Sequence, residues 1–440
     1  MKYRFYTLGC KVNQYETQAM EQQLAALGHT AGEEGECDAY IINTCTVTAV
    51  ADRKNRTLIR RLRRENPDAI VAVCGCYAQI STDEVRELGV DVISGSSGRE
   101  AFLQLLLDAV RTRDGAKRVA VDEALRRRSF EQLPAGGLSE RTRAMLKVQD
   151  GCNNFCTYCI IPYARGPVRS LPLEQAVDEA CRLAAQGYRE IVITGIEIAS
   201  WGWEWRNGSR FAALAEAICR AVPEVRIRLG SLEPRVVDEA FCEALSQCKN
   251  LCPQFHLSLQ SGSDTVLRRM NRKYDTARYR ESVALLHRYF PGCAVTTDLI
   301  VGFPQETDEE LAQSLAFAEE CGFAAMHVFP YSRRAGTPAD AMPGQIPKAV
   351  KAERAALAGQ TARRLREKFD TALLGTTQQV LFEQTEDGFF TGHAPCGVKV
   401  YAHGDSLHNV VRAVRITALR ADGVEGTLLP EGAAMREGSL

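Results

Sequence analysis

Short apolar runs alternate with helical patterns over the first 100 residues of the chain. The apolar runs are YRFYTL, AYIINT, AIVAV and VDVIS, and stretches such as 14–27 and 48–65 between them have helical periodicity. Strands that alternate with helices are typical of βαβ units, in which the strands run parallel. The pattern predicts an α/β chain that begins with a doubly wound parallel β/α domain over residues 1–111.

A second series of strands and helices is predicted beyond residues 112–141. That segment is rich in Arg, Glu, Pro and Gly, and its composition predicts a linker. Six apolar runs then occur with helical patterns between them: AMLKVQD, EIVITG, VRIRLGS, QFHLSLQS, TTDLIVGFP and MHVFPYS. Six repeats predict a partial β/α barrel over 142–371, with polar residues at the carboxyl ends of its strands facing an active site.

After residue 371 the pattern changes to short strands without intervening helices. The segments TQQVLFEQ, GFFTGHA, VKVYA, VVRAVRITALR and VEGTLL are separated by Gly, Asp and Asn. Such a series predicts a small all-β barrel over 372–435.

Composition narrows the class of protein. A length of 440 residues fits about three domains, and no run of about 18 apolar residues offers a membrane span. The start of the chain lacks the apolar stretch of a signal peptide, so we expect a cytoplasmic protein with no membrane partner. A net charge of −1 gives no global attraction to a polyanion, so any contact with nucleic acid must be local. Sixteen cysteines in a reducing compartment indicate metal binding, catalysis or core packing rather than disulfides.

Three cysteines follow successive strands of the N-terminal pattern. Cys10, Cys45 and Cys76 each come directly after an apolar run, at separations that match one βα unit. Loops at the carboxyl ends of parallel strands converge on one crevice, so these thiols are expected to meet there. Cys74 is the rival for the third place, but it lies within the strand and is expected to be buried.

Three further cysteines have the spacing CxxxCxxC. Cys152, Cys156 and Cys159 follow the first barrel strand, at its active end. Thiolates suit iron–sulfur clusters or zinc, and three of them leave one iron of a [4Fe–4S] cluster free to bind substrate. A structural zinc site normally takes four ligands, and the next cysteine, Cys181, lies in an apolar helical pattern that predicts a core position.

Four motifs resemble the radical-SAM methylthiotransferase family. They are DGCNNFCTYCIIPYARGPVRS, RLGSLEP, FHLSLQSGSD and TDLIVGFPQET, and they occur in the family's order. The resemblance implies a radical enzyme that uses S-adenosylmethionine and two [4Fe–4S] clusters. It assigns Cys152, Cys156 and Cys159 to the catalytic cluster and Cys10, Cys45 and Cys76 to an auxiliary one.

The same resemblance implies further sites and partners. The C-terminal barrel takes the place of the family's RNA-binding TRAM domain. A low-potential electron donor such as flavodoxin or ferredoxin, and a sulfur donor, are implied as partners. Some of the polar strand-end residues also admit structural roles, Gly195 as a turn and Glu233 as a cap. Candidates for the S-adenosylmethionine pocket are the strand-end residues Gly195, Glu197, Ser231, Glu233, Gln260 and Asp298.

The start TLGCKVNQYET resembles the branch of the family that acts on threonylcarbamoyladenosine at position 37 of tRNA. The expected reaction is methylthiolation of adenine C2, with the anticodon arm of tRNA as the partner. Alternatives within the family are isopentenyladenosine at the same position and a ribosomal-protein aspartate. Outside it, the rivals are an iron–sulfur electron carrier and a plain RNA-binding protein, neither of which needs a six-strand barrel.

Basic and aromatic residues are the candidates for tRNA contacts. The segment RKNRTLIRRLRR at 53–64 is strongly basic, although each arginine can equally be a surface ion pair. The alternation of Trp201, Trp203 and Trp205 suits either base stacking or one hydrophobic face. Further basic residues flank the second cysteine motif: Arg141, Arg143, Lys147, Arg165 and Arg169.

Overall fold

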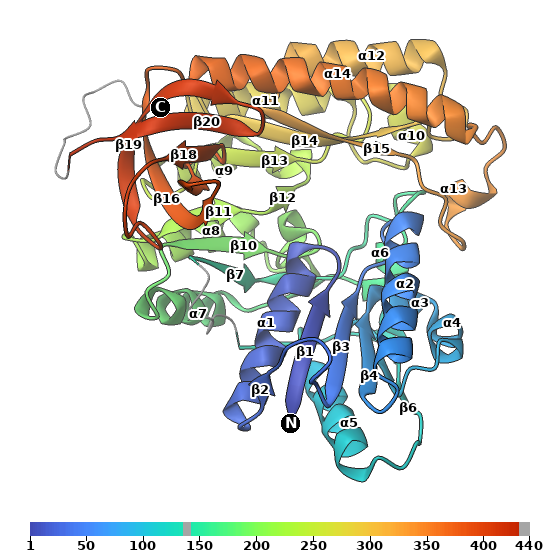
Figure 1. Cartoon of the computed structure of the whole chain (residues 1–440). Helices are drawn as coiled ribbons and strands as arrows, with labels where there is room; N and C mark the ends of the chain where they lie inside the picture. Colours follow the sequence, from blue (N-terminus) through green and yellow to red (C-terminus); the bar gives the residue numbers. More distant parts are fainter. Residues whose placement is uncertain (135–141, 431–440) are drawn as a thin grey trace.

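The computed structural model describes residues 1–134 and 142–430 of the chain. Three units are visible in Figure 1: an N-terminal β/α sheet, a larger β/α unit beside it, and a small β-barrel near the C-terminus. Among the described residues, no helix is both long and apolar enough to span a lipid bilayer. The three units confirm the predicted fold class in each of its parts.

The N-terminal sheet has six parallel strands in the order β2-β1-β3-β4-β5-β6. All six residues of β3 are buried, as expected for a strand covered on both faces. The sixth strand lies within the segment predicted as a linker. The sequence gave no readable pattern for it, because it has only three residues and two of them are exposed. The strands are β1 (Lys2–Thr7), β2 (Thr30–Ala31), β3 (Ala39–Thr44), β4 (Ile70–Gly75), β5 (Val92–Ser94) and β6 (Arg118–Ala120).

Helices cover both faces of this sheet. One face packs against α1 (Lys11–Ala26) and α5 (Arg99–Thr112), and the other against α2 (Ala49–Glu65), α3 (Cys76–Ile80) and α4 (Thr82–Glu87). The strand order reverses between β1 and β3. Ligands of such sheets bind outside the carboxyl ends of the strands at this reversal point.

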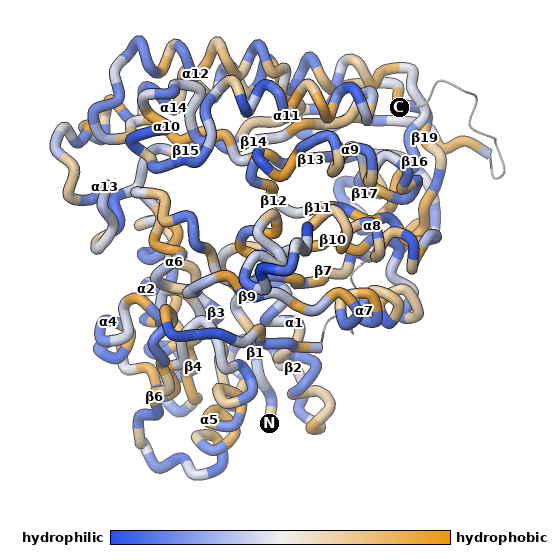
Figure 2. The backbone as a smooth tube through the Cα atoms, turned by 180° about the vertical axis from the view of Figure 1, so that it is seen from behind, coloured by the Kyte–Doolittle hydropathy of each residue, from blue (hydrophilic) through white to orange (hydrophobic). Residues whose placement is uncertain are grey.

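The second unit is a partial barrel of parallel strands with helices outside. It consists of the sheets β11-β10-β7 and β12-β13-β14-β15, joined by a bridge between Ile227 and Leu251. Hydrophilic and hydrophobic residues alternate along helices α12 and α14 (Figure 2), and each helix buries one face. The strands are β7 (Arg143–Lys147), β10 (Glu190–Thr194), β11 (Arg226–Leu229), β12 (Ser231–Leu232), β13 (Gln254–Leu257), β14 (Ala294–Val301) and β15 (Ala325–Pro330). The helices are α7 (Leu173–Ala185), α8 (Phe211–Ala221), α9 (Glu239–Ser246), α10 (Asp264–Arg269), α11 (Thr276–Tyr289), α12 (Asp308–Cys321), α13 (Pro338–Ala341) and α14 (Lys348–Ala372).

The third unit is a closed five-stranded barrel in the order β16-β17-β18-β20-β19. Its core consists of small and branched side chains such as Val380, Val400 and Val414. The last residues of the predicted domain, 431–435, lie outside the described part of the chain. The strands are β16 (Thr377–Glu386), β17 (Phe389–His393), β18 (Lys399–Ala402), β19 (Val411–Arg420) and β20 (Gly423–Leu428).

The HAPCG turn at 393–397 joins the small barrel to the start of the partial barrel's strands. Arg228 donates to the carbonyl oxygens of Pro395 at 3.0 Å and Ala394 at 3.3 Å. The Nε of Arg228 pairs with the fully buried Glu190 at 2.7 Å. Burial alone would raise the pKa of Glu190, but the charges of Arg228 and Arg226 outweigh burial and lower the pKa to about 2. The turn therefore completes the hydrogen bonding of arginines that a closed protein interior would otherwise leave unsatisfied.

We predict that Arg228→Gln lowers the free energy of unfolding by about 3 kcal/mol, because Glu190 loses a buried partner and the small barrel loses two hydrogen bonds. Urea denaturation followed by circular dichroism measures the change. Arg220→Gln is the control: Arg220 is exposed and pairs with Glu216 one turn away on the same helix, so its effect should stay within about 0.5 kcal/mol. Equal effects of the two variants would contradict this account of the interface.

Candidate functional site

The N-terminal cysteine set, Cys10, Cys45 and Cys76, lies at the carboxyl ends of β1, β3 and β4. Cys10 is the N-cap of α1, Cys45 follows β3, and Cys76 begins α3. Gly9 has a φ of +123°, and a Cβ there would lie 2.7 Å from the Cβ of Cys45. The reversal of strand order thus brings the first two loops of the set into contact, as predicted from the sequence.

Asn13 fixes the backbone around this set. Its Nδ2 donates to the carbonyl oxygens of Leu8 and Thr44, both at 3.0 Å, and its Oδ1 lies 3.5 Å from the Cys10 sulfur. Burial, with smaller contributions from the nearby thiols of Cys76 and Cys10, raises the pKa of Cys45 to about 12. A thiol in this environment stays protonated at neutral pH unless a metal takes its proton's place.

Cys74 and Cys76 occupy different environments. Cys74 is fully buried in the apolar cluster that includes Met20 and Phe102, on the α1 and α5 face of the sheet. Cys76 instead receives a hydrogen bond from Arg165 Nε at 3.2 Å and lies in electrostatic reach of Cys10. The structure therefore groups Cys76, and not Cys74, with the other two thiols.

The barrel cysteine set, Cys152, Cys156 and Cys159, lies in the loop between β8 (Gln149–Asp150) and α6 (Ile161–Arg165). Gly151 begins this loop with a φ of +75°, and a Cβ there would lie 1.9 Å from the carbonyl oxygen of Pro167. The Cys152 amide donates to Gly166 at 3.0 Å, and the Cys159 amide to Cys156 at 2.9 Å. These bonds fold the loop so that its three thiols lie in electrostatic reach of one another.

The segment 270–274 supports the barrel set from the opposite side, a role that the sequence analysis missed. Arg272 donates to the Cys156 sulfur at 3.3 Å, and its guanidinium lies 4.7 Å from the ring centre of Tyr274. The Thr157 amide also donates to Met270 at 3.0 Å. A basic and aromatic pair in a short inter-helix segment carries no recognisable signal by itself.

The two sets lie in electrostatic reach of each other. Cys159 has its pKa raised to about 12 by burial and by Cys156, with a smaller contribution from Cys76 of the other set. A cubane cluster with one open iron takes three thiolates, each on a different iron atom, and each set supplies that number of thiols.

Glu197 is the predicted pocket residue with the least satisfied side chain. Its Oε1 is buried without a hydrogen-bond partner, and its Oε2 accepts from Asn154 at 3.3 Å. Burial, and then the neighbouring Glu233, raise the pKa of Glu197 to about 7. An unsatisfied carboxyl beside the cysteine loop is suited to a hydrogen-bond donor on a ligand.

The other predicted pocket residues differ in what they contact. Gly195 is required sterically, since a Cβ would lie 2.8 Å from the Gln149 carbonyl. Gln260 has a φ of +69° and donates its amide to Asp298 at 2.9 Å. Glu233 caps a short helical turn and pairs with Arg235 at 2.8 Å, which is the structural role left open above. Asp298 pairs with His256, while Ser231 is exposed.

Comparison with known proteins was decisive for the family. Residues 146–318 match the model of the Radical SAM superfamily, and residues 2–95 match the Uncharacterized protein family UPF0004. A threonylcarbamoyladenosine tRNA methylthiotransferase MtaB of Bacillus subtilis is 39% identical over 417 residues, covering 93% of this chain and 92% of its own. This chain belongs to the radical-SAM methylthiotransferases. It uses S-adenosylmethionine and [4Fe–4S] clusters, as that family does.

Two further relatives and one solved structure define the limits of the similarity. The MtaB enzyme of Thermotoga maritima is 36% identical over 96% of this chain and 95% of its own. A tRNA-2-methylthio-N(6)-dimethylallyladenosine synthase of Pelotomaculum thermopropionicum is 33% identical, covering 97% of each chain. The radical S-adenosylmethionine methyltransferase TsrM of Kitasatospora setae has a TM-score of 0.55 at 18% identity, covering 77% of this chain and 75% of its own, and shares the fold alone.

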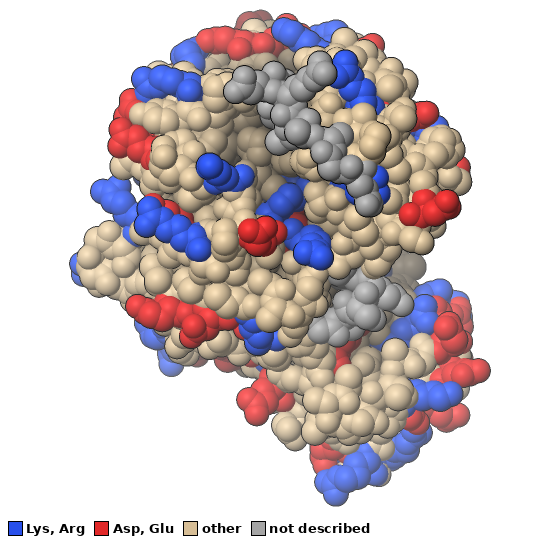
Figure 3. All heavy atoms as spheres, turned by 90° about the vertical axis from the view of Figure 1, so that its left-hand side faces the viewer, with Lys and Arg blue, Asp and Glu red and all other residues tan. Residues whose placement is uncertain are grey.

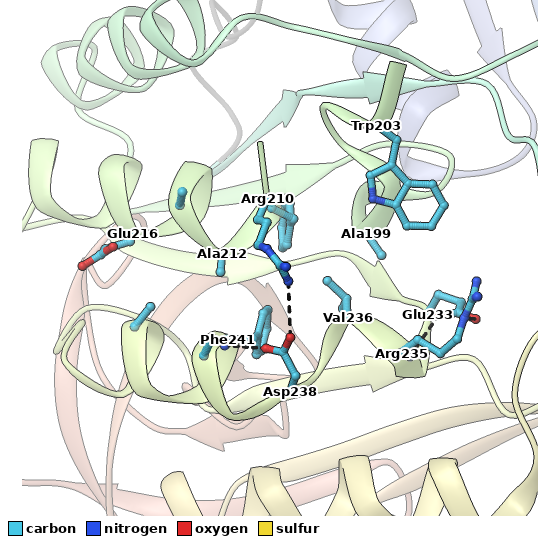
Figure 4. A pocket seen from close by; sticks show the side chains of 14 residues that line it. Ala199, Trp203, Arg210, Ala212, Glu216, Glu233, Arg235, Val236, Asp238 and Phe241 are labelled. Atoms are coloured by element: carbon cyan, nitrogen blue, oxygen red, sulfur yellow. Dashed lines mark hydrogen bonds and ion pairs between the residues drawn. The ribbon is translucent and has the colours of Figure 1, made fainter. Parts of the chain in front are cut away.

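A cavity of about 370 Å³ lies beside the methylthiotransferase site (Figure 4). Glu233 and Arg235 form one end of it, below Trp203, while Arg210 and Asp238 pair across it at 3.5 Å. None of the residues that line it is a cysteine. The cavity therefore adjoins the candidate S-adenosylmethionine residues at Glu233 without including either cysteine set.

Several basic residues that the sequence offered as tRNA contacts are in fact buried. Lys147, Arg165 and Arg169 are at most 3% exposed, so they cannot reach a phosphate. All three pair with the buried Asp150, and Lys147 and Arg165 also pair with Glu16, which is more than 100 residues away in sequence and so gave no indication of burial. Arg143 is partly buried and pairs with Glu383 of the small barrel at 2.9 Å, and Arg141 lies outside the described residues.

The basic helix α2 is largely paired. Arg56, Arg61, Arg63 and Arg64 all form ion pairs, while Arg60 is exposed. On the face in Figure 3, Lys and Arg side chains are likewise interspersed with Asp and Glu. Most arginines of α2 are therefore engaged in ion pairs, which is one of the two roles that the sequence left open.

The tryptophans do not form a stacking platform. Trp201 is buried and donates its Nε1 to Leu171 at 2.8 Å, and Trp205 packs edge-on against it. Trp203 is half exposed.

We predict that Gly151→Ala abolishes the cluster of the barrel set, because the added Cβ overlaps Pro167 and forces the loop open. Anaerobically reconstituted protein should fall from about eight irons per chain to about four. Gly187→Ala is a matched control: it also has a positive φ, of +91°, but no atom lies near the added Cβ. Full iron loading of Gly151→Ala would show that the loop tolerates the change.

Proposed function

We propose that this protein methylthiolates C2 of N6-threonylcarbamoyladenosine at position 37 of tRNA, producing the 2-methylthio derivative. The observation that carries the proposal is the pairing of two three-cysteine sets at one junction, in a chain whose most similar relatives quoted above are named for this substrate. The dimethylallyl-adenosine branch is the alternative, and its relative has lower identity. An aspartate of a ribosomal protein remains the other substrate alternative.

We assign one [4Fe–4S] cluster to Cys152, Cys156 and Cys159 and a second to Cys10, Cys45 and Cys76. When bound, the first cluster and S-adenosylmethionine supply a 5′-deoxyadenosyl radical, and the second supplies the sulfur. The side chains around them orient the reactants and keep water out. Residues assigned to the S-adenosylmethionine pocket are Gly195, Glu197, Ser231, Glu233, Gln260 and Asp298.

The remaining assignments concern the surroundings of the enzyme. The small C-terminal barrel is proposed to contact the anticodon arm as a TRAM domain. A low-potential donor such as flavodoxin or ferredoxin would reduce the clusters, a sulfur donor would replenish the second one, and the cytoplasm is the compartment that holds all of these partners.

We predict that replacing Cys10, Cys45 and Cys76 by Ala uncouples the reaction. The triple variant should still release 5′-deoxyadenosine, because the barrel set lies in the other unit, but it should form no methylthio product. Chromatography of small products and mass spectrometry of nucleosides from threonylcarbamoylated tRNA measure the two activities.

Cys74→Ala is the control for that experiment. As a buried packing residue it should cost roughly 1–2 kcal/mol of stability and leave both activities largely intact. If Cys74→Ala lost the second cluster while Cys76→Ala kept it, the choice of third ligand would be reversed. If the wild-type enzyme modified only dimethylallyl-adenosine tRNA, the substrate assignment would be wrong.

Lys11 is a candidate for recognition of the substrate's charge. It follows Cys10, its side chain is exposed, and its ammonium forms no hydrogen bond or ion pair with the described residues. It lies in electrostatic reach of Arg143 of β7, Glu190 of β10 and Arg228 of β11. A threonylcarbamoyl group carries a carboxylate, whereas a dimethylallyl group carries no charge.

We therefore predict that Lys11→Gln lowers kcat/KM for threonylcarbamoylated tRNA about tenfold or more, chiefly through KM, since a charge-assisted hydrogen bond is worth about 1.5–3 kcal/mol. Steady-state assays with that tRNA measure the effect. Lys54→Gln, at an exposed lysine of α2, should leave KM for the same tRNA within about twofold. An unchanged KM in Lys11→Gln would exclude a role for this ammonium.

A further inference from the structure

The guanidinium of Arg165 lies between the two cysteine sets. Arg165 ends helix α6, six residues after Cys159, and its side chain is completely buried. Its Nε donates to the Cys76 sulfur at 3.2 Å, and its Nη2 donates to Asn13 Oδ1 at 3.0 Å. Its Nη1 pairs with Glu16, and with Asp150 at 3.4 Å. One side chain thus extends from the loop of the barrel set to a sulfur of the N-terminal set.

The charges around Arg165 do not balance. Glu16 and Asp150 are the two fully enclosed carboxylates of this network, and each contacts several cations. Half-buried Glu131 lies in electrostatic reach of two of these cations and offsets part of the excess. The four buried cations that share the two carboxylates are Arg99, Lys147, Arg165 and Arg169.

A buried surplus of positive charge is costly unless an anion offsets it. Arginine cannot lose its proton at physiological pH, so the surplus cannot be removed by titration of Arg165. Three thiolates on a cluster at Cys10, Cys45 and Cys76 supply negative charge beside it, and the Nε–H of Arg165 points at one of those sulfurs. The network is therefore complementary to a loaded cluster rather than to three neutral thiols.

We propose that Arg165 is a positioning residue for the N-terminal cluster: by its hydrogen bond to Cys76 it holds that ligand against the barrel loop and keeps the cluster's reduction potential higher than it would otherwise be. This inference rests on the proposed function for the existence of the two clusters. Hydrogen bonds to ligand sulfurs and nearby positive charge stabilise the more negative, reduced state of an iron–sulfur cluster. Arg165 therefore links the geometry of one cysteine set to the electronic state of the other.

The test is a potentiometric titration of the full-length reconstituted enzyme, followed by electron paramagnetic resonance. A variant with Cys152, Cys156 and Cys159 replaced by Ala retains only the N-terminal cluster and so identifies that cluster's signal. Arg165→Gln should shift the N-terminal potential to more negative values, and Arg165→Lys, which keeps the charge but not the Nε–H, should shift it less. Release of 5′-deoxyadenosine should persist in both variants.

Arg99→Gln is the matched control. Arg99 is equally buried and pairs with Glu16 at 2.7 Å, but it donates to the Gly95 carbonyl and to no cysteine sulfur. The reduction potential of the N-terminal cluster should change less in Arg99→Gln than in Arg165→Gln. The double variant Glu16→Gln with Arg165→Gln covers the case in which Arg165→Gln alone does not fold, since it removes one charge of each sign.

Each result decides the matter. An unchanged N-terminal potential in Arg165→Gln, or in the double variant where the single one fails to fold, overturns the proposal. Loss of the N-terminal iron in the Arg165 variants, with full iron in Arg99→Gln, supports the positioning role. Equal iron loss in Arg99→Gln assigns the effect to the whole buried network and overturns a specific role for Arg165. A wild-type enzyme with two clusters but no methylthio product would instead count against the proposed function alone.

Discussion

The buried ion pairs between α1, β7 and α6 fasten the N-terminal sheet to the partial barrel. Burial alone would raise the pKa of Glu16, yet Arg165, Arg99 and Lys147 together lower it to about 2, so this carboxylate is charged throughout the physiological range. Breaking such a pair by removing one partner leaves an uncompensated charge in the interior, at a cost of several kcal/mol. Both cysteine sets lie beside this network, and their separation is fixed by it.

The same physical device recurs at the other end of the partial barrel. There Glu190 is shared by Arg226 and Arg228, and the carbonyl oxygens of the 393–397 turn accept the remaining guanidinium hydrogens. Carbonyl oxygens suit this position because they satisfy arginine donors without adding net charge. The small barrel is thus fixed to the strand starts, and the strand ends remain available for the cysteine loops.

Sequence patterns were sufficient for the main strands and helices and for the order of the cysteines, because strand periodicity and loop position are local properties. They missed β6, which has only three residues. They could not place Arg165 or Lys147, whose spacing in sequence is that of ordinary surface residues. Their partner Glu16 is more than 100 residues away, and only the packed structure brings the three together. The prediction for Cys181 failed in the opposite direction, from buried to exposed. Its apolar helical pattern predicted a core position, but the residue is exposed on α7.

The two networks also explain why the thiols suit a cluster and not free nucleophiles. Burial raises the pKa of Cys45 and Cys159 to about 12, so neither is an anion at neutral pH without a metal. Cluster binding converts them to thiolates and places negative charge beside the surplus cations of the domain junction. Loading the clusters and closing the junction between the two β/α units are therefore favourable to each other. An apo enzyme should hold its two units together less firmly than a loaded one, because the cations at the junction then lack the anions that they are arranged to meet.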